Sequence, residues 1–345
     1  MRIGVLTGGG DCPGLNAVLR AIVKRAVRSH GWDVAGVRHG WRGLLLDEID
    51  ELDLDDVSGI LPRGGTILGT SRTNPYHEPD GEARVRRAFE THGIGALIAI
   101  GGEDTLGAAC KLAASGLPIV GVPKTIDNDV SGTDYTFGFD TAMAVATEAI
   151  DRLHTTAESH DRVMVVEVMG RHAGWIALEA GIAGGADLIL IPEFPVTTRE
   201  ISQVVERRHD RSKSFSIIVV AEGAQVTDDN GAPLFVPGDK RDAFGHVRLG
   251  GIAPAIAEEV EAKTGFETRY TVLGHIQRGG SPTAFDRVLG SRFGVAAVDL
   301  VAEEGYGRMV AVQGTKIVTI PLTEAVGSMK TVSPELYEMA RVFFS

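Results

Sequence analysis

The chain has 345 residues, of which 43% are hydrophobic and 23% are charged, and its formal net charge is −12. This length predicts about two globular domains, and the acidic balance argues against nucleic acid and anionic membranes as partners. No apolar run approaches the roughly 20 residues that span a bilayer, and two cysteines set no disulfide framework, so we expect a cytoplasmic protein.

Short apolar segments that end in glycine alternate with helical patterns along the chain. Residues Arg2–Thr7 are predicted as the first strand, and apolar residues at helical spacing follow it. The later predicted strands are residues 96–100, 118–122, 163–168, 188–191 and 215–221, with helices at 104–115 and 139–153. Strands that alternate with helices predict an α/β fold of mostly parallel sheets with helices on both faces.

Glycine-rich or charged segments come directly after these predicted strands. They are residues 8–11, 101–104, 124–129, 167–171 and 222–224. In doubly wound folds, ligands bind at the carboxyl ends of the strands. The sequence therefore predicts that these segments contribute to a binding site.

The first two of these segments suit phosphate binding. Residues 7–21 form a strand, a glycine loop that contains Gly10, and the start of a helix, where unpaired N–H groups favour anions. This loop has neither a GxGxxG fingerprint nor the GK[ST] of a Walker A motif. In the second segment, Glu103 or Asp104 could hold Mg²⁺ through carboxylate oxygens, or both could only stabilise the start of a helix.

The segment VPKTIDNDV at residues 122–130 combines acidic and basic groups. Phosphoryl transfer to a hydroxyl needs a carboxylate that accepts the proton and cations that stabilise the transferring group. Asp127 and Asp129 could supply the carboxylates, and Lys124 could bind phosphate. The alternative is an Asp-rich turn whose side chains cap local N–H groups.

Several basic residues lie outside helical faces. Arg72, Arg171 and Arg278 stand in loops with glycine, and a single loop arginine is usually a solvated charge. Because guanidinium groups bind phosphate in a bidentate manner, the set predicts a shared anion site. Its members are Arg72, Arg162, Arg171, Arg269, His275 and Arg278.

Taken together, these segments resemble the phosphofructokinase family over nearly the whole chain. The matching segments are GGGDCPGLN (8–16), GGEDT (101–105), PKTIDND (123–129), EVMGRHAGW (167–175), AEGA (221–224) and LGHIQRGGSP (273–282). They occur in the family's order and spacing. The resemblance implies transfer of a phosphoryl group to the 1-hydroxyl of fructose 6-phosphate with Mg²⁺, in glycolysis or gluconeogenesis.

On the donor side, the resemblance implies a role for each matching position. Asp127 matches the catalytic base, Gly10 would contact the donor phosphate, and Arg72 resembles an arginine that stabilises the transferring charge. Glu103 stands at the metal position, where many members carry Asp. Direct and water-mediated Mg²⁺ contacts both remain open there.

On the sugar side, the resemblance implies ligands from one chain and from its neighbour. The expected ligands from the same chain are Thr125, Asp127, Met169, Gly170, Arg171 and Glu222, with His275 and Arg278 on the 6-phosphate. Arg162 and Arg269 match arginines that reach the sugar phosphate from the neighbouring subunit. Such sharing implies a homodimer or a homotetramer.

The family's architecture is two doubly wound, mostly parallel α/β domains. The resemblance places residues 1–138 and 251–302 in a domain that binds the phosphoryl donor. It places residues 139–250 and 303–345 in a domain that binds fructose 6-phosphate.

Two positions decide the expected donor. Members that use ATP typically have Gly after the metal-binding acid, and this chain has Asp104, which would crowd the nucleotide and repel its α-phosphate. Lys124 stands where many ATP users have Gly, and it could hold the terminal phosphate of pyrophosphate. The pair resembles the pyrophosphate-dependent members, so we expect reversible transfer from pyrophosphate.

Three other functions are considered beside pyrophosphate-dependent phosphoryl transfer. An ATP-dependent 6-phosphofructokinase would share every acceptor residue. A non-catalytic sugar-phosphate-binding regulatory subunit is disfavoured because Asp127 is present. A dinucleotide-dependent oxidoreductase is disfavoured because the chain lacks the GxGxxG fingerprint. Allosteric effectors, residual ATP use and other sugar-phosphate acceptors are not predicted either way.

Overall fold

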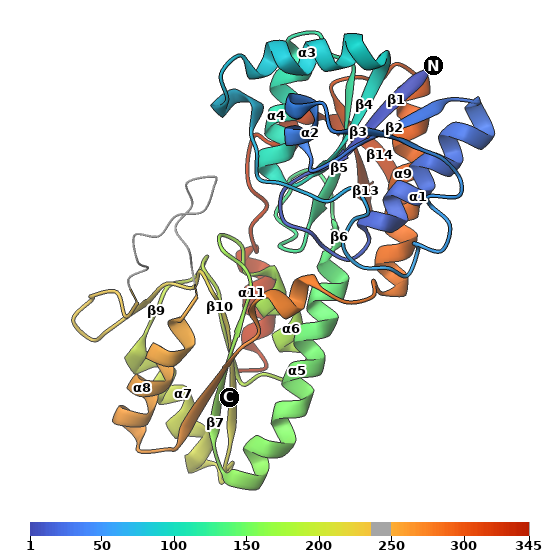
Figure 1. Cartoon of the computed structure of the whole chain (residues 1–345). Coiled ribbons are helices and arrows are strands. Elements are labelled where there is room, and N and C mark those ends of the chain that lie inside the picture. Colours follow the sequence, from blue (N-terminus) through green and yellow to red (C-terminus); the bar gives the residue numbers. More distant parts are fainter. Residues whose placement is uncertain (236–249, 345) are drawn as a thin grey trace. The chain divides into compact units, whose positions relative to one another are not determined.

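A computed structural model describes residues 1–235 and 250–344 of the chain (Figure 1). The chain forms two compact units, which we call unit 1 and unit 2. Unit 1 comprises Met1–Thr141 and Arg278–Met329, and unit 2 comprises Ala142–Gln277 and Lys330–Ser345. Within the described residues, no helix is both long and apolar enough to cross a bilayer.

Unit 1 is built on an eight-stranded sheet. The main strand order is β14-β13-β5-β4-β1-β2-β3, and β6 pairs with β5. The pairs of β1, β4 and β5 with one another are parallel, whereas the outer pairs β2–β3 and β13–β14 are antiparallel. The strands are β1 (Arg2–Thr7), β2 (Asp33–Val37), β3 (Ile49–Leu52), β4 (Ile94–Gly101), β5 (Ile119–Thr125), β6 (Phe137–Gly138), β13 (Arg308–Gln313) and β14 (Lys316–Pro321).

Helices cover both faces of this sheet, as the alternating pattern predicted. On one face, α1 packs against α9, which also contacts β4, β5 and β13. On the other face, a single apolar core joins the sheet to α2, α3, α4 and α10. The helical segments of unit 1 are α1 (Leu15–Arg25), η1 (Ala26–His30), α2 (Trp41–Leu46), η2 (Pro75–His77), α3 (Gly81–His92), α4 (Glu103–Ala114), α9 (Ala284–Ala302) and α10 (Leu322–Ala325).

Unit 2 is a smaller α/β unit built on a parallel sheet. Its sheet has the order β12-β7-β10-β8 with every pair parallel, and β9 and β11 form a separate two-stranded pair. The strands are β7 (Val163–Val168), β8 (Leu188–Leu190), β9 (Val196–Thr197), β10 (Ser216–Ala221), β11 (Val226–Thr227) and β12 (Thr268–Val272). The helical segments are α5 (Phe139–His160, which begins in unit 1), α6 (Trp175–Ala183), α7 (Thr198–Asp210), α8 (Ile252–Thr264), η3 (Gly274–Arg278, whose last residue belongs to unit 1) and α11 (Pro334–Arg341).

The two units divide the chain at different points from the predicted domains. Residues 251–277 were assigned to the first domain, but α8 and β12 belong to unit 2, where β12 extends the sheet beside β7. Residues 303–329 were assigned to the second domain, but β13 extends the sheet of unit 1 beside β5. Strand pairing therefore determines the division in both cases.

A buried carboxylate in unit 1 should make stability depend on pH. Asp286 at the start of α9 is fully buried, and its Oδ2 accepts hydrogen bonds from the backbone N–H and the hydroxyl of Thr141. Burial raises the pKa of Asp286 to about 6, although the bonds from Thr141 oppose the shift. The folded state therefore holds this proton more tightly than the unfolded chain, in which an aspartate pKa is about 3.9.

We expect this contribution to stability to be complete below about pH 4 and to be lost as pH rises through about 6. The loss is on the order of 3 kcal/mol for a shift of about two pKa units. In Asp286→Asn, the free energy of unfolding should fall less steeply over this range. Asp299→Asn, a change on the same helix at a partly exposed carboxylate, should keep the wild-type slope. Equal slopes in Asp286→Asn and wild type, measured by urea unfolding at several pH values, would contradict this account.

Candidate active site

The phosphate-binding segments predicted from the sequence meet at the carboxyl ends of the central strands of unit 1. They follow β1, β4 and β5, which are adjacent parallel strands, so their carboxyl ends lie together. We call residues 8–11 the glycine loop. The backbone N–H of Gly8 donates to Ile100 O at 2.9 Å, which ties this loop to the end of β4.

Two cations lie against the glycine loop. The ammonium of Lys124, at the end of β5, donates a hydrogen bond to Gly10 O. Arg278 Nη1 donates to Asp11 O at 3.2 Å, and a Cβ added to Gly10 would lie only 2.7 Å from the same nitrogen. A side chain at residue 10 would displace this guanidinium, so glycine lets Arg278 lie against the loop, which has two positive charges beside it.

Lys124 is a buried cation. Its residue is 3% exposed, and burial lowers its pKa, as does the nearby charge of Arg278. The negative charges of Asp11 and Asp127 act in the opposite direction and raise the pKa. A buried ammonium beside a glycine loop interacts strongly with a phosphate, because little water screens the pair.

The segment that carries Arg72 closes another side of the glycine loop. Gly9 N donates to Ser71 O at 3.0 Å, and Thr70 Oγ1 donates to Gly9 O at 2.6 Å. Arg72 follows directly and is exposed. The structure therefore brings Gly10, Lys124, Arg278 and the segment of Arg72 together. The sequence assigned the first two and Arg72 to the donor, and Arg278 to the sugar 6-phosphate.

Glu103 and Asp104 form the first turn of α4, and both are exposed. Helix α4 starts beside the glycine loop, because a Cβ on Gly8 would meet Thr105 Oγ1 at 2.6 Å. It also starts beside the end of β5, since a Cβ on Gly102 would lie 3.4 Å from Lys124 O. The positive end of the helix dipole thus points toward the same edge as Lys124.

The turn after β5 holds Asp127 in a defined backbone conformation. Asp127 N donates to Thr125 Oγ1 at 3.0 Å, and Asn128 adopts a left-handed conformation with φ 52°, which Asn tolerates. Asn128 Oδ1 accepts from Thr136 N at 3.1 Å, and Thr136 Oγ1 donates to Thr125 O at 2.7 Å. Sequence reasoning missed this supporting role of Asn128 and Thr136.

The sugar-side residues that were predicted from the same chain and belong to unit 2 lie at the carboxyl ends of β7 and β10. Glu222 follows β10, and its N–H donates to Val168 O at the end of β7 at 2.9 Å. Gly223 N donates to Gly170 O at 3.1 Å, and any Cβ on Gly223 would lie 1.9 Å from Arg171 O. The segments with Met169, Gly170, Arg171 and Glu222 are therefore in direct backbone contact.

The short helix η3 brings His275 to this end of the sheet. Gln277 is fully buried, and its Oε1 accepts a hydrogen bond from Met169 N at 3.4 Å. Leu273 N donates to Glu167 O at 2.9 Å, which fixes the start of the segment. His275 between them is exposed. The buried carboxylate of Glu167 accepts hydrogen bonds from Gly251 N and Ala253 N and so caps α8. The sequence indicated only that Glu167 belongs to a segment at the end of a strand, and not that it caps a helix.

Arg162 and Arg269 do not join this group. Arg162 precedes β7, and Arg269 pairs with Met164 near the start of the same strand. Both guanidinium groups bind Glu267 Oε1, at 2.8 Å for Arg162. At about 3.3 Å per residue, the length of β7 separates them from Met169 by more than 10 Å. Within one chain, these two arginines therefore lie apart from the sugar-side residues, and their expected contact with the site of a neighbouring subunit stays a prediction.

A model of the family described as phosphofructokinase matches residues 2–301. The chain belongs to the phosphofructokinase family. It is 60% identical over 344 residues, with full coverage of both chains, to a protein of Amycolatopsis methanolica named pyrophosphate--fructose 6-phosphate 1-phosphotransferase. It is also 55% identical, over 99% of both chains, to a protein of Streptomyces coelicolor named ATP-dependent 6-phosphofructokinase 3. Members named for either donor are thus close relatives.

Solved phosphofructokinases share this fold. The phosphofructokinase of Saccharomyces cerevisiae superposes with a TM-score of 0.81 at 36% identity. The match covers 94% of this chain and 45% of the yeast chain, so the present chain spans less than half the length of that relative. The predicted fold class, two doubly wound sheets of the phosphofructokinase type, is confirmed.

Proposed function

We propose that this protein is a cytoplasmic pyrophosphate-dependent phosphofructokinase. It reversibly transfers a phosphoryl group from pyrophosphate to the 1-hydroxyl of fructose 6-phosphate. The observation that carries this proposal is the contact of buried Lys124 with the glycine loop beside the turn of Asp127. That edge offers cations for a compact polyanion and a carboxylate for the attacking hydroxyl.

The mechanism follows from these positions. Asp127 accepts the proton of the 1-hydroxyl as the sugar oxygen forms its bond to the terminal phosphorus of pyrophosphate. The bridging P–O bond breaks, and orthophosphate leaves. Lys124 and the N–H groups of the glycine loop bind the donor phosphates, and Arg72 stabilises the charge on the transferring group.

The first turn of α4 fits a magnesium ion. Mg²⁺ usually takes one or two protein carboxylates and completes its shell with water and substrate phosphate oxygens. Glu103 offers an exposed carboxylate beside the glycine loop. Across residues 1–235 and 250–344, no cluster of three or more metal-ligating side chains could hold an ion alone, which suits a metal that arrives with its phosphates. When bound, Mg²⁺ neutralises donor charge.

Asp104 and Lys124 support pyrophosphate as the donor. Asp104 places a carboxylate in the first turn of α4, where the resemblance to ATP-dependent family members leads us to expect a nucleotide's α-phosphate. Lys124 supplies a positive charge suited to a small donor. With one enzyme preparation and saturating fructose 6-phosphate and Mg²⁺, we expect kcat/KM for pyrophosphate to exceed that for ATP by at least about a hundredfold, or roughly 3 kcal/mol. Equal or faster turnover with ATP would reject pyrophosphate as the preferred donor. It would favour the ATP-dependent alternative, for which a relative that is 55% identical is named.

The sugar side is proposed to bind fructose 6-phosphate through Thr125, Asp127, Met169, Gly170, Arg171, Glu222, His275 and Arg278. Arg162 and Arg269 are proposed to serve the site of a neighbouring subunit in a homodimer or homotetramer. Their position at the amino end of β7 supports this, because the same chain's Met169 follows the opposite end. They are exposed or half-buried. Both bind Glu267, and Arg269 also lies 3.7 Å from Glu261 Oε2 and donates to Thr268 O, but each guanidinium has five N–H donors, so some can bind a further anion.

Subunit mixing tests this sharing directly. Arg162→Ala and Asp127→Asn should each be nearly inactive alone. In a mixed dimer, one site combines the intact Asp127 of one chain with the intact Arg162 of the other, and the second site carries both defects. Random mixing should therefore restore about a quarter of wild-type activity. Mixed samples that stay as inactive as the separate variants would show that Arg162 acts within its own chain.

A further inference from the structure

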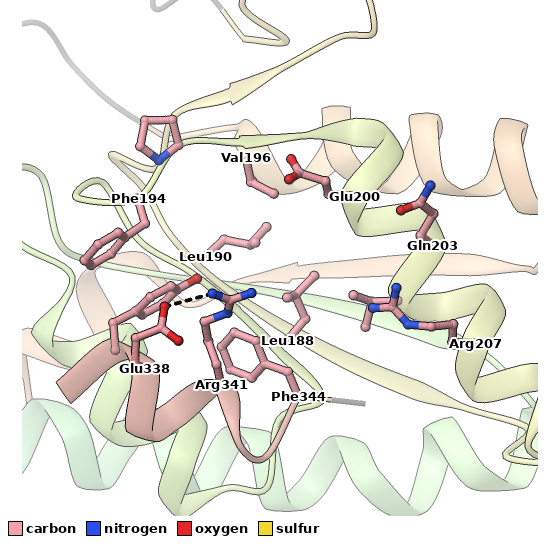
Figure 2. Close-up of a pocket in the computed structure, with 13 residues that line it drawn as sticks. Leu188, Leu190, Phe194, Val196, Glu200, Gln203, Arg207, Glu338, Arg341 and Phe344 are labelled. Atoms are coloured by element: carbon pink, nitrogen blue, oxygen red, sulfur yellow. Dashed lines mark hydrogen bonds and ion pairs between the residues drawn. The ribbon is translucent and has the colours of Figure 1, made fainter. Parts of the chain in front are cut away.

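Unit 2 contains a cavity at the end of its sheet that the proposed reaction does not use. The cavity measures about 580 Å³, within the range of small-molecule sites. Its floor is formed by Leu188 and Leu190 of β8, which lies at the end of the sheet beside β10 (Figure 2). Its walls come from α7 on one side and from the C-terminal helix α11 on the other. We call it the edge cavity.

Aromatic rings make up one end of the edge cavity. Phe194 and Tyr337 stack with centroids 4.4 Å apart and planes at 5°, and Phe344 meets Tyr337 edge-on at 5.8 Å. The hydroxyl of Tyr337 donates to Ile189 O at 2.9 Å, which anchors α11 to β8. Burial raises the pKa of Tyr337 to about 12, so this donor stays protonated at physiological pH. The cavity is thus built on a fixed ring cluster.

The charged groups at the rim favour an anion. Glu200 accepts hydrogen bonds from the N–H and hydroxyl of Thr197 in a capping box, and Glu338 accepts from Arg341 at 2.8 Å. Both carboxylates are therefore already bound within their own helices. Arg207, in the last turn of α7, has no carboxylate within 4.0 Å among the residues that the structure describes. Figure 2 shows Arg207 and Arg341 approaching the cavity from the two walls.

We propose that the edge cavity is a second small-molecule site, which binds a flat aromatic ring carrying one anionic group. The ring would lie over Leu188 and Leu190 against Phe344, where apolar burial and aromatic contact stabilise it. The anion would bind Arg207 with Arg341 beside it. Inorganic phosphate alone would leave the apolar floor unused, and a neutral ring would leave Arg207 without a partner.

Calorimetric titration of the full-length enzyme tests this proposal. Fructose 6-phosphate is kept saturating, so that anion binding at the sugar site does not contribute. The probes are 2-naphthoate, 2-naphthalenemethanol with the same ring and no charge, and acetate with the charge and no ring. We expect one 2-naphthoate to bind per chain, about tenfold or more tighter than either other probe, as one charge-assisted hydrogen bond would give.

Matched variants locate the binding. Arg207→Ala should weaken 2-naphthoate about tenfold and leave 2-naphthalenemethanol unchanged. Arg211→Ala removes an exposed arginine at the same end of α7 that does not line the cavity, and it should bind as wild type does. Gln203→Trp, at an exposed position on the lining, should block both ring-containing probes while thermal melting confirms the fold. Equal effects of Arg207→Ala and Arg211→Ala, or unchanged binding in Gln203→Trp, would overturn the proposal, as would binding of 2-naphthoate no tighter than acetate.

Discussion

Replacing Asp127 with asparagine is expected to lower kcat by about a thousandfold, because general-base assistance contributes roughly 10²–10⁴. Asparagine keeps the size of the side chain and preserves the bond from the backbone N–H of residue 127 to Thr125 Oγ1. It removes the carboxylate that is proposed to accept the proton of the 1-hydroxyl. The KM for fructose 6-phosphate should change little, since the base acts mainly in the transition state.

A matched control lies two residues away. Asp129→Asn removes a carboxylate from the same turn, and it should lower kcat by less than about tenfold if Asp127 alone is the base. Steady-state rates in both directions, with circular dichroism as a check of folding, separate the two variants. Equal losses in both variants would indicate that the turn supplies only negative charge. A large rise in KM with an intact kcat would move Asp127 from catalysis to sugar binding.

The segments after strands could be predicted from the sequence because two local signals coincide there. Buried parallel strands read as continuous apolar runs, and the polar or glycine-rich residues that follow them must lie at the carboxyl edge. Arg2–Thr7 and Val163–Val168 were predicted with their observed bounds. The contact of Lys124 with the glycine loop then follows from the adjacency of β5, β4 and β1.

Other parts of the fold had no such local signal. Strand β12 carries exposed Tyr270 and Val272 and reads as a polar, mixed segment, so its pairing with β7 could not be predicted from its sequence. The C-terminal pair β13 and β14 joins unit 1 through long-range pairing with β5. For the same reason, the residue types alone grouped Arg162 with Arg171 and His275 in one anion site. Residue type alone does not show at which end of a strand an arginine lies.

The roles of Asn128 and Gln277 were also hidden from sequence reasoning. Each is a buried amide whose oxygen accepts a backbone N–H from a segment that is separate from its own turn. Such residues position the groups on either side of them, Asp127 in one case and His275 in the other. A polar residue inside a loop motif gives no sign, in a single sequence, of whether it contacts substrate or supports the loop.

The donor preference should change when Asp104 is replaced by glycine. A carboxylate about 4 Å from a phosphate oxygen near a protein surface costs on the order of 4 kcal/mol, and removing it should raise kcat/KM for ATP by at least about tenfold. Asp104 lies in the first turn of α4, directly after the residue proposed to hold Mg²⁺. Turnover with pyrophosphate should persist, because Lys124 and the glycine loop are unchanged.

Asp104→Asn separates the two parts of this argument. Asparagine removes the charge and keeps the volume. If charge repulsion alone excludes ATP, Asp104→Asn should have the same kcat/KM for ATP as Asp104→Gly. If crowding alone excludes ATP, its kcat/KM for ATP should stay close to that of wild type. We expect an intermediate value, since both the charge and the size of Asp104 oppose a nucleotide at the start of α4. If the folded glycine variant remained inactive with ATP while still using pyrophosphate, the donor would have to be selected elsewhere. The buried ammonium of Lys124 is the next group to test, because it contacts the glycine loop that is proposed to bind the donor phosphates.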